Sequence, residues 1–147
     1  MSVAWRIGRP RRRVSSLALA VAALALSGGV AISETLAGSE WVPIEIQGAP
    51  ASDGSRAFVR FGGEGRLSGN SGCNRFTGSY EIDGVTIRIG PGVPMTRMAC
   101  PPAVMEEEMR LIQALEAARG FARDGISLDL TDEDGASVLR MRQTDWD

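Results

Sequence analysis

Four Asp-Gly dipeptides divide the chain at positions 53–54, 83–84, 124–125 and 134–135. Both residues tolerate the positive φ angles of tight hairpin turns, so Asp-Gly between extended runs favours a β-hairpin. Apolar and polar residues alternate in the intervening runs, as in the segment ISLDL at 126–130. A period of two with one apolar face is typical of a half-buried antiparallel strand. The sequence therefore predicts seven or eight short antiparallel strands.

The first of these runs begins near Trp41, and we expect Val42, Ile44 and Ile46 to share one apolar face. Later runs place aromatic and branched aliphatic residues in the same alternation. Their expected inward-facing residues are Phe76, Tyr80, Ile82, Ile87, Ile89, Leu128, Leu130, Leu139 and Met141.

A single segment, Pro101 to Arg119, has helical spacing instead. Proline is tolerated at the start of a helix, and Gly120 is the expected C-terminal cap. Glu106 and Glu107 are expected on the solvated face, near the positive end of the helix dipole. The expected core-facing stripe consists of Val104, Leu111, Leu115 and Ala118, flanked by Ile112.

The N-terminus has the pattern of a secretory signal peptide over residues 1–33. Arginines precede an apolar run from Val14 to Leu26, and small residues follow, with cleavage expected after Ser33 or after Ala31. The alternative is a retained anchor, although the run is shorter than the ~20 apolar residues of a spanning helix. No lipid-attachment cysteine follows it, so we expect a periplasmic or secreted protein without a stable membrane anchor. Residues 34–147 then form one domain, with a core at 39–142.

The composition excludes several classes of chemistry. The chain has no histidine and no lysine, so it lacks Ser-His and Cys-His pairs, histidine metal ligands and a Schiff-base lysine. Removing residues 1–33 leaves 11 arginines and 18 acidic residues, a net charge of −7. Because phosphate contacts need a basic surface, we expect no nucleic-acid partner. We also expect no metal and no cofactor.

Two sequence blocks carry a family resemblance: GCNRFTGSY at 72–80 and TRMAC at 96–100, followed by the helical segment. In this order and spacing they resemble the META domain family, which includes HslJ-like stress proteins. The resemblance implies an α+β fold, a compact curved antiparallel sheet or small barrel of seven to eight strands with one helix packed across it. It further implies an envelope protein linked to stress or antibiotic tolerance, without enzymatic activity or cofactor.

Cys73 and Cys100 are the only cysteines. In an exported protein an even cysteine count indicates a disulfide between them. Two buried free thiols are the main alternative. A metal site with two cysteines, or a nucleophilic cysteine activated by Arg75 or Arg97, is a weaker one.

The residues beside the cysteines, Asn74, Arg75, Thr96 and Arg97, have two interpretations. They form a polar binding patch, or their side chains bond the irregular backbone around the cysteines, as turns with unpaired backbone groups require. The acidic run from Asp132 to Gly135 resembles the start of a calcium loop but lacks its later ligands, so we interpret it as a hairpin turn.

Glu108 lies inside the apolar stripe, within about 40° of Val104 and about 20° of Leu115 on the helical wheel. A carboxylate there is costly unless it is paired. We therefore expect Glu108 to be buried and bonded to Arg75, Arg97 or the backbone of their loops. The alternative is a helix rotated so that Glu108 meets water.

Three hypotheses for function remain open. The first is a non-enzymatic stress protein, expected to be a monomer, that binds a protein or a small apolar ligand. The second is a structural or interaction module accessory to a secretion or envelope complex, and the third is a carboxylate-dependent hydrolase. A closed barrel with an apolar cavity would favour ligand binding, whereas a filled interior would favour the interaction module.

Overall fold

The computed structural model describes residues 36–144, so the expected signal peptide lies outside the described residues. Within this range the chain forms one nine-stranded antiparallel sheet and one α-helix. The strands are β1 (Ser39–Ile46), β2 (Ala49–Pro50), β3 (Phe58–Phe61), β4 (Arg66–Asn70), β5 (Arg75–Asp83), β6 (Thr86–Ile89), β7 (Gly120–Asp124), β8 (Ser127–Thr131) and β9 (Ser137–Gln143). A 3₁₀ turn, Gly63–Gly65, precedes β4, and the helix is α1 (Pro102–Ala117).

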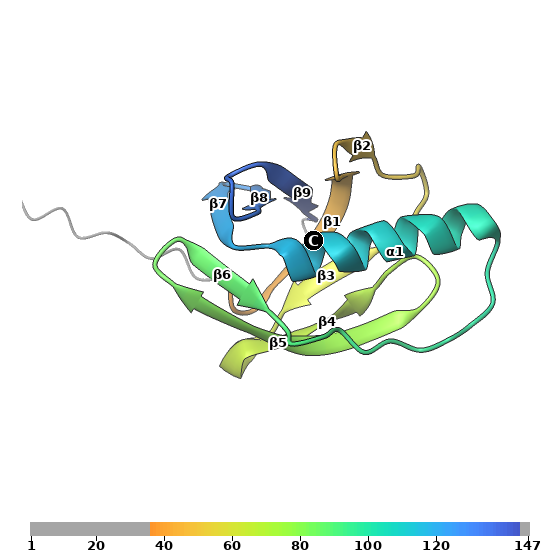
Figure 1. Ribbon diagram of the computed structural model, residues 1–147, viewed down its shortest axis with the longest axis horizontal. Coiled ribbons are helices and arrows are strands. Elements are labelled where there is room, and N and C mark those ends of the chain that lie inside the picture. The colour runs from red at the N-terminus through yellow and green to blue at the C-terminus, as the bar shows by residue number, and fades with distance from the viewer. Residues whose placement is uncertain (1–35, 145–147) are drawn as a thin grey trace, which may run out of the picture. The chain divides into compact units, whose positions relative to one another are not determined.

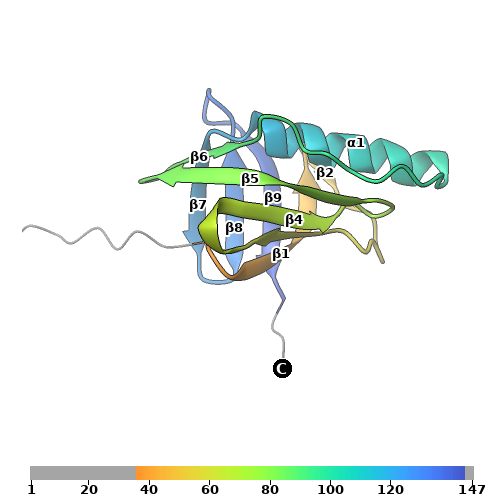
Figure 2. The same cartoon turned by 90° about the horizontal axis from the view of Figure 1, so that it is seen from below.

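The sheet closes on itself because β1 pairs with β3 on one side and with β9 on the other. Eight strands complete the barrel in the order β1-β3-β4-β5-β6-β7-β8-β9, and the two-residue β2 is an addition to β1. Figure 2 shows β4 and β5 crossing the direction of β8 and β9, with α1 lying along one side of the barrel. The expected α+β barrel with one helix packed across it is confirmed.

Three of the four Asp-Gly dipeptides form hairpin turns between neighbouring strands. Gly84, Gly125 and Gly135 have φ angles of 60°, 57° and 80°, which a side chain would strain. Asp53-Gly54 behaves differently, because it lies in the loop from β2 to β3, which are not paired with each other. That loop crosses to α1, as described below.

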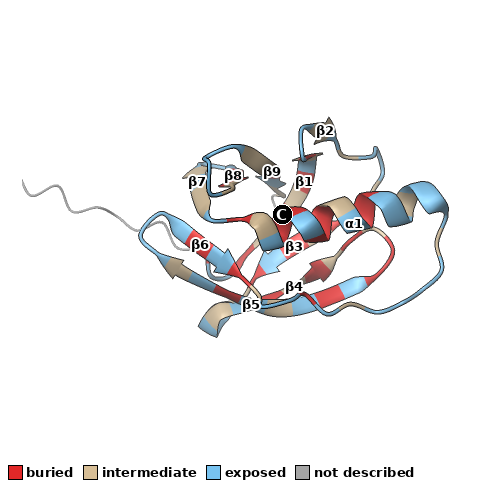
Figure 3. Ribbon diagram, viewed as in Figure 1, coloured by how far each residue is buried: buried red, intermediate tan, exposed pale blue. Residues whose placement is uncertain are grey.

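Apolar side chains from the strands and α1 pack into one core, and Figure 3 shows where the buried residues lie along these elements. Trp41 is fully buried, and its indole N–H donates to the Ser39 hydroxyl at 2.7 Å. Phe61 and Tyr80 meet edge to face, with ring centroids 5.1 Å apart. The large side chains that are fully buried are Leu36, Trp41, Ile46, Phe61, Leu67, Phe76, Leu111, Leu115, Leu128, Leu130, Leu139 and Met141.

The expected apolar face of β1 is wrong at two of its three positions. Ile46 is buried, but Val42 is only half-buried and Ile44 is 50% exposed, whereas Trp41 and Pro43 are buried. The ladder with β9 shifts register between Pro43 and Glu45, so Ile44 is the extra residue of a β-bulge, and this shift returns Ile46 to the inner face.

The helix ends earlier than its sequence pattern indicates. It stops at Ala117, and Gly120 begins β7 instead of capping α1. The Arg119 guanidinium bonds the carbonyls of Glu116 and Ala118 at 2.8 and 2.7 Å, which satisfies the last turn. Gly120 is required for another reason, since a Cβ there would lie 2.7 Å from the Thr131 hydroxyl oxygen.

Candidate functional site

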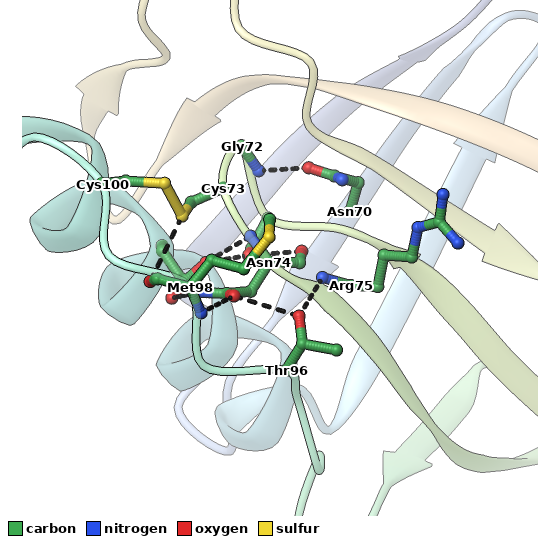
Figure 4. The surroundings of a disulfide bond; sticks show 10 residues. Asn70, Gly72, Cys73, Asn74, Arg75, Thr96, Met98 and Cys100 are labelled. Carbon is green, nitrogen blue, oxygen red and sulfur yellow. Dashed lines mark hydrogen bonds between the residues drawn. A yellow bond between two sulfur atoms is a disulfide. The ribbon is translucent and has the colours of Figure 1, made fainter.

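The two cysteines join the β4–β5 loop to the segment that leads into α1 (Figure 4). Cys73 lies in the loop from β4 to β5, and Cys100 lies at the end of the long connection from β6 to α1. They form a disulfide with a Cα–Cα distance of 6.2 Å across 27 positions of sequence. Cys73 is buried and Cys100 is partly exposed. The bond therefore ties the β4–β5 loop to the start of the helix, as the cysteine count indicated.

Asn74, next to Cys73, is a buried hydrogen-bonding centre with 2% exposure. Its side-chain nitrogen donates to Glu108 Oε1 at 2.9 Å. Its side-chain oxygen accepts from the Thr96 hydroxyl at 3.0 Å and from the Met98 backbone N–H at 2.7 Å. One amide thus connects the β4–β5 loop, the β6–α1 connection and the helix.

Thr96 also pairs with the backbone of Arg75. The Arg75 N–H donates to the Thr96 hydroxyl at 3.1 Å, and the Thr96 N–H donates to the Arg75 carbonyl at 3.0 Å. The side chains of Arg75 and Arg97 are exposed, and neither forms an ion pair or hydrogen bond with any residue in 36–144. The bonding interpretation therefore describes Asn74 and Thr96, whereas the two guanidinium groups face solvent.

Glu108 is buried, with 4% exposure, as its position in the apolar stripe indicated. One carboxylate oxygen accepts from the Asn74 backbone N–H at 3.0 Å and from the Ser71 hydroxyl, and the other accepts from the Asn74 amide. Within the described residues, neither Arg75 nor Arg97 pairs with it; of the expected partners, it is the loop backbone that bonds Glu108, through the Asn74 N–H beside Arg75. Neutral donors already surround the carboxylate, and a guanidinium left in water avoids a large desolvation cost.

The electrostatics of Glu108 follow from these contacts. Burial raises the pKa of the Glu108 carboxyl, but the hydrogen bonds from Ser71 and Asn74 outweigh burial and hold the pKa below its ordinary value. The ionised form is therefore the one that the folded protein favours.

Glu107 does not lie on the solvated face of the helix, where the sequence predicted it. Glu106 is exposed, but Glu107 is only 5% exposed. Its carboxylate accepts from the Ser52 backbone N–H at 3.0 Å and from the Ser52 hydroxyl. Arg110 lies beside it, with a guanidinium nitrogen 3.9 Å away. The β2–β3 loop contacts this side of α1 and covers the Glu107 carboxylate.

Adjacent carboxylates thus fasten α1 to two different loops. Glu107 binds Ser52 of the β2–β3 loop, and Glu108 binds Ser71 and Asn74 of the β4–β5 loop. The two serines were missed by sequence reasoning, although Ser71 lies beside the GCNRFTGSY block. Serine is common in loops, and which hydroxyl meets a helix carboxylate depends on how the loops fold over the helix.

This arrangement is a structural hydrogen-bond network that holds α1 against the two loops. Almost every polar atom of Asn74, Glu107 and Glu108 is engaged by a neighbour. Within residues 36–144, no group of three or more Cys, Asp or Glu side chains is placed to hold a metal ion. Over the same range, no helix is long and apolar enough to cross a membrane.

Comparison with known proteins places these features in a family. The sequence matches the META domain over residues 34–145, most of the chain and all of the barrel. This chain belongs to the META domain family. The two sequence blocks that resembled the family are the segments joined by the disulfide and by Asn74. A search of curated proteins gave no match.

Solved structures share the fold at low sequence identity. An NMR structure of a protein from Burkholderia xenovorans is 23% identical, with a TM-score of 0.60 over 76% of this chain and 85% of that one. A crystal structure of a DUF4847 family protein from Bacteroides vulgatus is 16% identical, with a TM-score of 0.59 over 79% and 99%. A further NMR structure is 24% identical, with a TM-score of 0.58 over 73% and 90%.

Proposed function

We propose that this META domain protein is exported to the cell envelope and acts there without catalysis, by binding a partner protein on its outer surface. We place this activity in stress or antibiotic tolerance, as the family resemblance implies. An accessory role in an envelope complex is a specific form of the same proposal.

The observation that carries the proposal is the filled barrel. Core side chains from all around the barrel and from α1 occupy the interior, including Trp41, Phe61 and Leu115 at 0% exposure. Ligand-binding barrels instead enclose a cavity lined by apolar side chains. The pocket formed by the β2–β3 loop and Glu107 lies at the surface and is lined mostly by polar and charged side chains, among them Asp53 and Arg56. A partner would therefore contact the exterior.

The candidate site supports a non-catalytic role. A general base or nucleophile must reach a substrate atom, whereas Glu108 and Asn74 are buried and bonded to each other. Export is supported by the disulfide, because such bonds persist in oxidising compartments.

A small apolar ligand is the second candidate, favoured by a shallow surface pocket of about 300 Å³. Ile44, exposed on the outer face of β1, lines this pocket together with Ala122 of β7, Arg123 and Arg140. Its size is at the lower end for ligand sites, about 300–1,000 Å³. Titration with a fluorescent apolar probe such as ANS, with Ile44→Ser as the comparison, tests this candidate.

The main proposal is tested in cells that produce the full chain. Fractionation and N-terminal sequencing should find it outside the cytoplasm, beginning near residue 34. Cross-linking in intact cells should then give a defined adduct with a second protein. Monomer alone, or a cytoplasmic chain with its N-terminus intact, contradicts the proposal.

The absence of catalysis has its own test. Screens with ester, peptide, glycoside and phosphate substrates should show no turnover that a point substitution removes. A reproducible activity abolished by replacing one Asp, Glu or Cys would establish an enzyme instead.

A further inference from the structure

The antiparallel pairing between β6 and β7 is very short. Thr86 and Gly120 are its one facing pair, and the Ile87 N–H donates across it to the Arg119 carbonyl at 2.9 Å. The Arg119 N–H, which would return a bond to Ile87 in a continued ladder, donates to the Thr131 carbonyl at 2.7 Å instead. The residues that precede Arg119 belong to helix α1 and its end, so no strand lies beside the rest of β6.

The free edge of β6 leaves backbone groups of Ile89 without partners. Along an antiparallel strand, successive residues direct their N–H and C=O groups to opposite sides. The Gly90 N–H donates to Ser79 of β5 at 3.0 Å and the Ile87 N–H donates away from β5, so Ile89 directs both of its groups away from β5. Within residues 36–144 nothing bonds these two groups. Ile89 is only 5% exposed, and buried backbone groups of this kind are rarely left unpaired.

A groove lies along this edge. One wall is the segment 88–92, and the other is formed by Glu116 and Arg119 at the end of α1, enclosing about 480 Å³. A second pocket of about 750 Å³ continues from it and shares Arg88 and Arg119. Figure 1 shows the C-terminal end of α1 beside β6. We call the two pockets together the β6 groove.

Acidic side chains outnumber basic ones in the β6 groove, with four carboxylates against the guanidinium groups of Arg88 and Arg119. Glu81, Asp83 and Glu133 line its larger pocket, and Glu116 lines the smaller one. Among the described residues, none of these four carboxylates forms an ion pair. One nitrogen of the Arg119 guanidinium donates to the carbonyls of Glu116 and Ala118. A ligand that carries basic side chains therefore fits this surface.

We propose that the β6 groove binds an extended, basic segment of a partner protein, which adds to β6 as a short extra strand. The segment would bond the free N–H and C=O of Ile89, and its basic side chains would meet the carboxylates at the Asp83 end. Main-chain bonds to a free strand edge supply affinity in this mode of recognition, and side-chain contacts supply specificity. The inference rests on the proposed protein-binding function and names its site.

The first test uses random heptapeptides displayed on phage and selected on the immobilised full chain. Selected peptides should be rich in Arg or Lys with β-branched residues. Glu116→Trp fills the groove and should weaken their binding at least tenfold. The matched control, Gln113→Trp, places the same ring on an exposed position of α1 outside the groove and should leave binding unchanged. Equal loss in both variants, or no enrichment of peptides, overturns the proposal.

The second test separates the backbone bond from groove shape. Ile89→Ala and Ile89→Pro both remove the buried side chain, but only proline also removes the N–H. Proline is tolerated on a strand edge whose N–H is unpaired, so both variants should give the same circular dichroism spectrum. Ile89→Ala should retain peptide binding and Ile89→Pro should lose it. Hydrogen exchange at the Ile89 amide in the unsubstituted protein gives a second measurement, since bound peptide should slow it.

The outcomes distinguish this inference from the function on which it rests. If the cellular cross-linked adduct forms equally with Glu116→Trp, the protein binds a partner elsewhere and the β6 groove is not the site. If the Ile89 amide is already protected in the free chain, a segment of the chain outside residues 36–144 occupies the groove, and the proposal of a partner strand fails. If neither adduct nor selected peptide appears, both proposals fail.

Discussion

Glu108 shows how a single buried carboxylate can be stabilised without a cation. Hydrogen bonds from Ser71 and Asn74 hold its pKa low, so the ionised group contributes stability above its unfolded-state pKa of about 4.3. Glu108→Gln presents an amide to donors arranged for a carboxylate. Bonds to charged groups contribute about 1.5–3 kcal/mol, so the variant should lose about 2–3 kcal/mol at pH 7 in urea unfolding.

The pH dependence of that loss is a sharper measurement. As pH falls through the lowered folded-state pKa, wild-type Glu108 takes up a proton and its contribution disappears. The difference between wild type and Glu108→Gln should therefore shrink in acid. Glu106→Gln, at the exposed neighbouring position, should stay within about 0.5 kcal/mol of wild type. A difference that grew in acid would contradict the assignment of the lowered pKa.

Position 74 requires an amide because its side chain both donates and accepts hydrogen bonds. Asn74→Asp keeps an acceptor for Thr96 and Met98 but turns a second carboxylate toward Glu108. Like charges this close cannot both remain ionised, so one carboxyl must hold a proton. We expect a loss of about 3–5 kcal/mol at pH 7, as for an uncompensated buried charge, and a smaller loss near pH 4. Thermal unfolding at the two pH values, with Asn74→Ala for comparison, measures it.

At the level of secondary structure elements, β4 lies against β5 through Gly69. A Cβ at Gly69 would come within 2.1 Å of the Phe58 carbonyl oxygen and 2.5 Å of the Phe76 ring. Gly69→Ala should therefore destabilise the protein by about 3 kcal/mol, the upper end of what overpacking usually costs. Gly78, in the adjacent strand β5, provides the matched control because a Cβ there meets nothing closer than 3.8 Å. Gly78→Ala should cost less than about 1 kcal/mol. Chemical unfolding of both variants compares them directly.

The element boundaries show why pattern alone was insufficient. The alternation of Leu128 and Leu130 predicted β8 correctly, because a strand with one buried and one solvent-exposed face has a period of two residues. The same alternation failed in β1, where Trp41 and Pro43 are buried instead of Val42 and Ile44, and a bulge after Pro43 returns Ile46 to the inner face. The helix pattern continued past Ala117, but the last residues before β7 were needed to close the barrel.

On the scale of the whole molecule, the disulfide stabilises the fold by restricting the unfolded chain. Closing a loop of this length contributes about 3–4 kcal/mol in the chain-entropy model. A Cys73→Ser, Cys100→Ser double variant should unfold at lower urea than oxidised wild type by that amount. Reduced wild type should resemble the variant. Equal stability of oxidised and reduced protein would show that the hydrogen bonds of Asn74, Glu107 and Glu108 hold the loops to α1 without help from the disulfide.

The sequence by itself determined the antiparallel strands, the single helix, the cysteine pair and the buried position of Glu108. Each depends on local periodicity, on turn chemistry or on the residue types present. The tertiary structure alone decided that Ser52 and Ser71 meet the helix carboxylates, that Arg75 and Arg97 face solvent, and that Glu107 is covered. It also left one edge of β6 unpaired. These features depend on which loops cross α1 and where the barrel closes, and such long-range contacts leave no periodic signal in the chain.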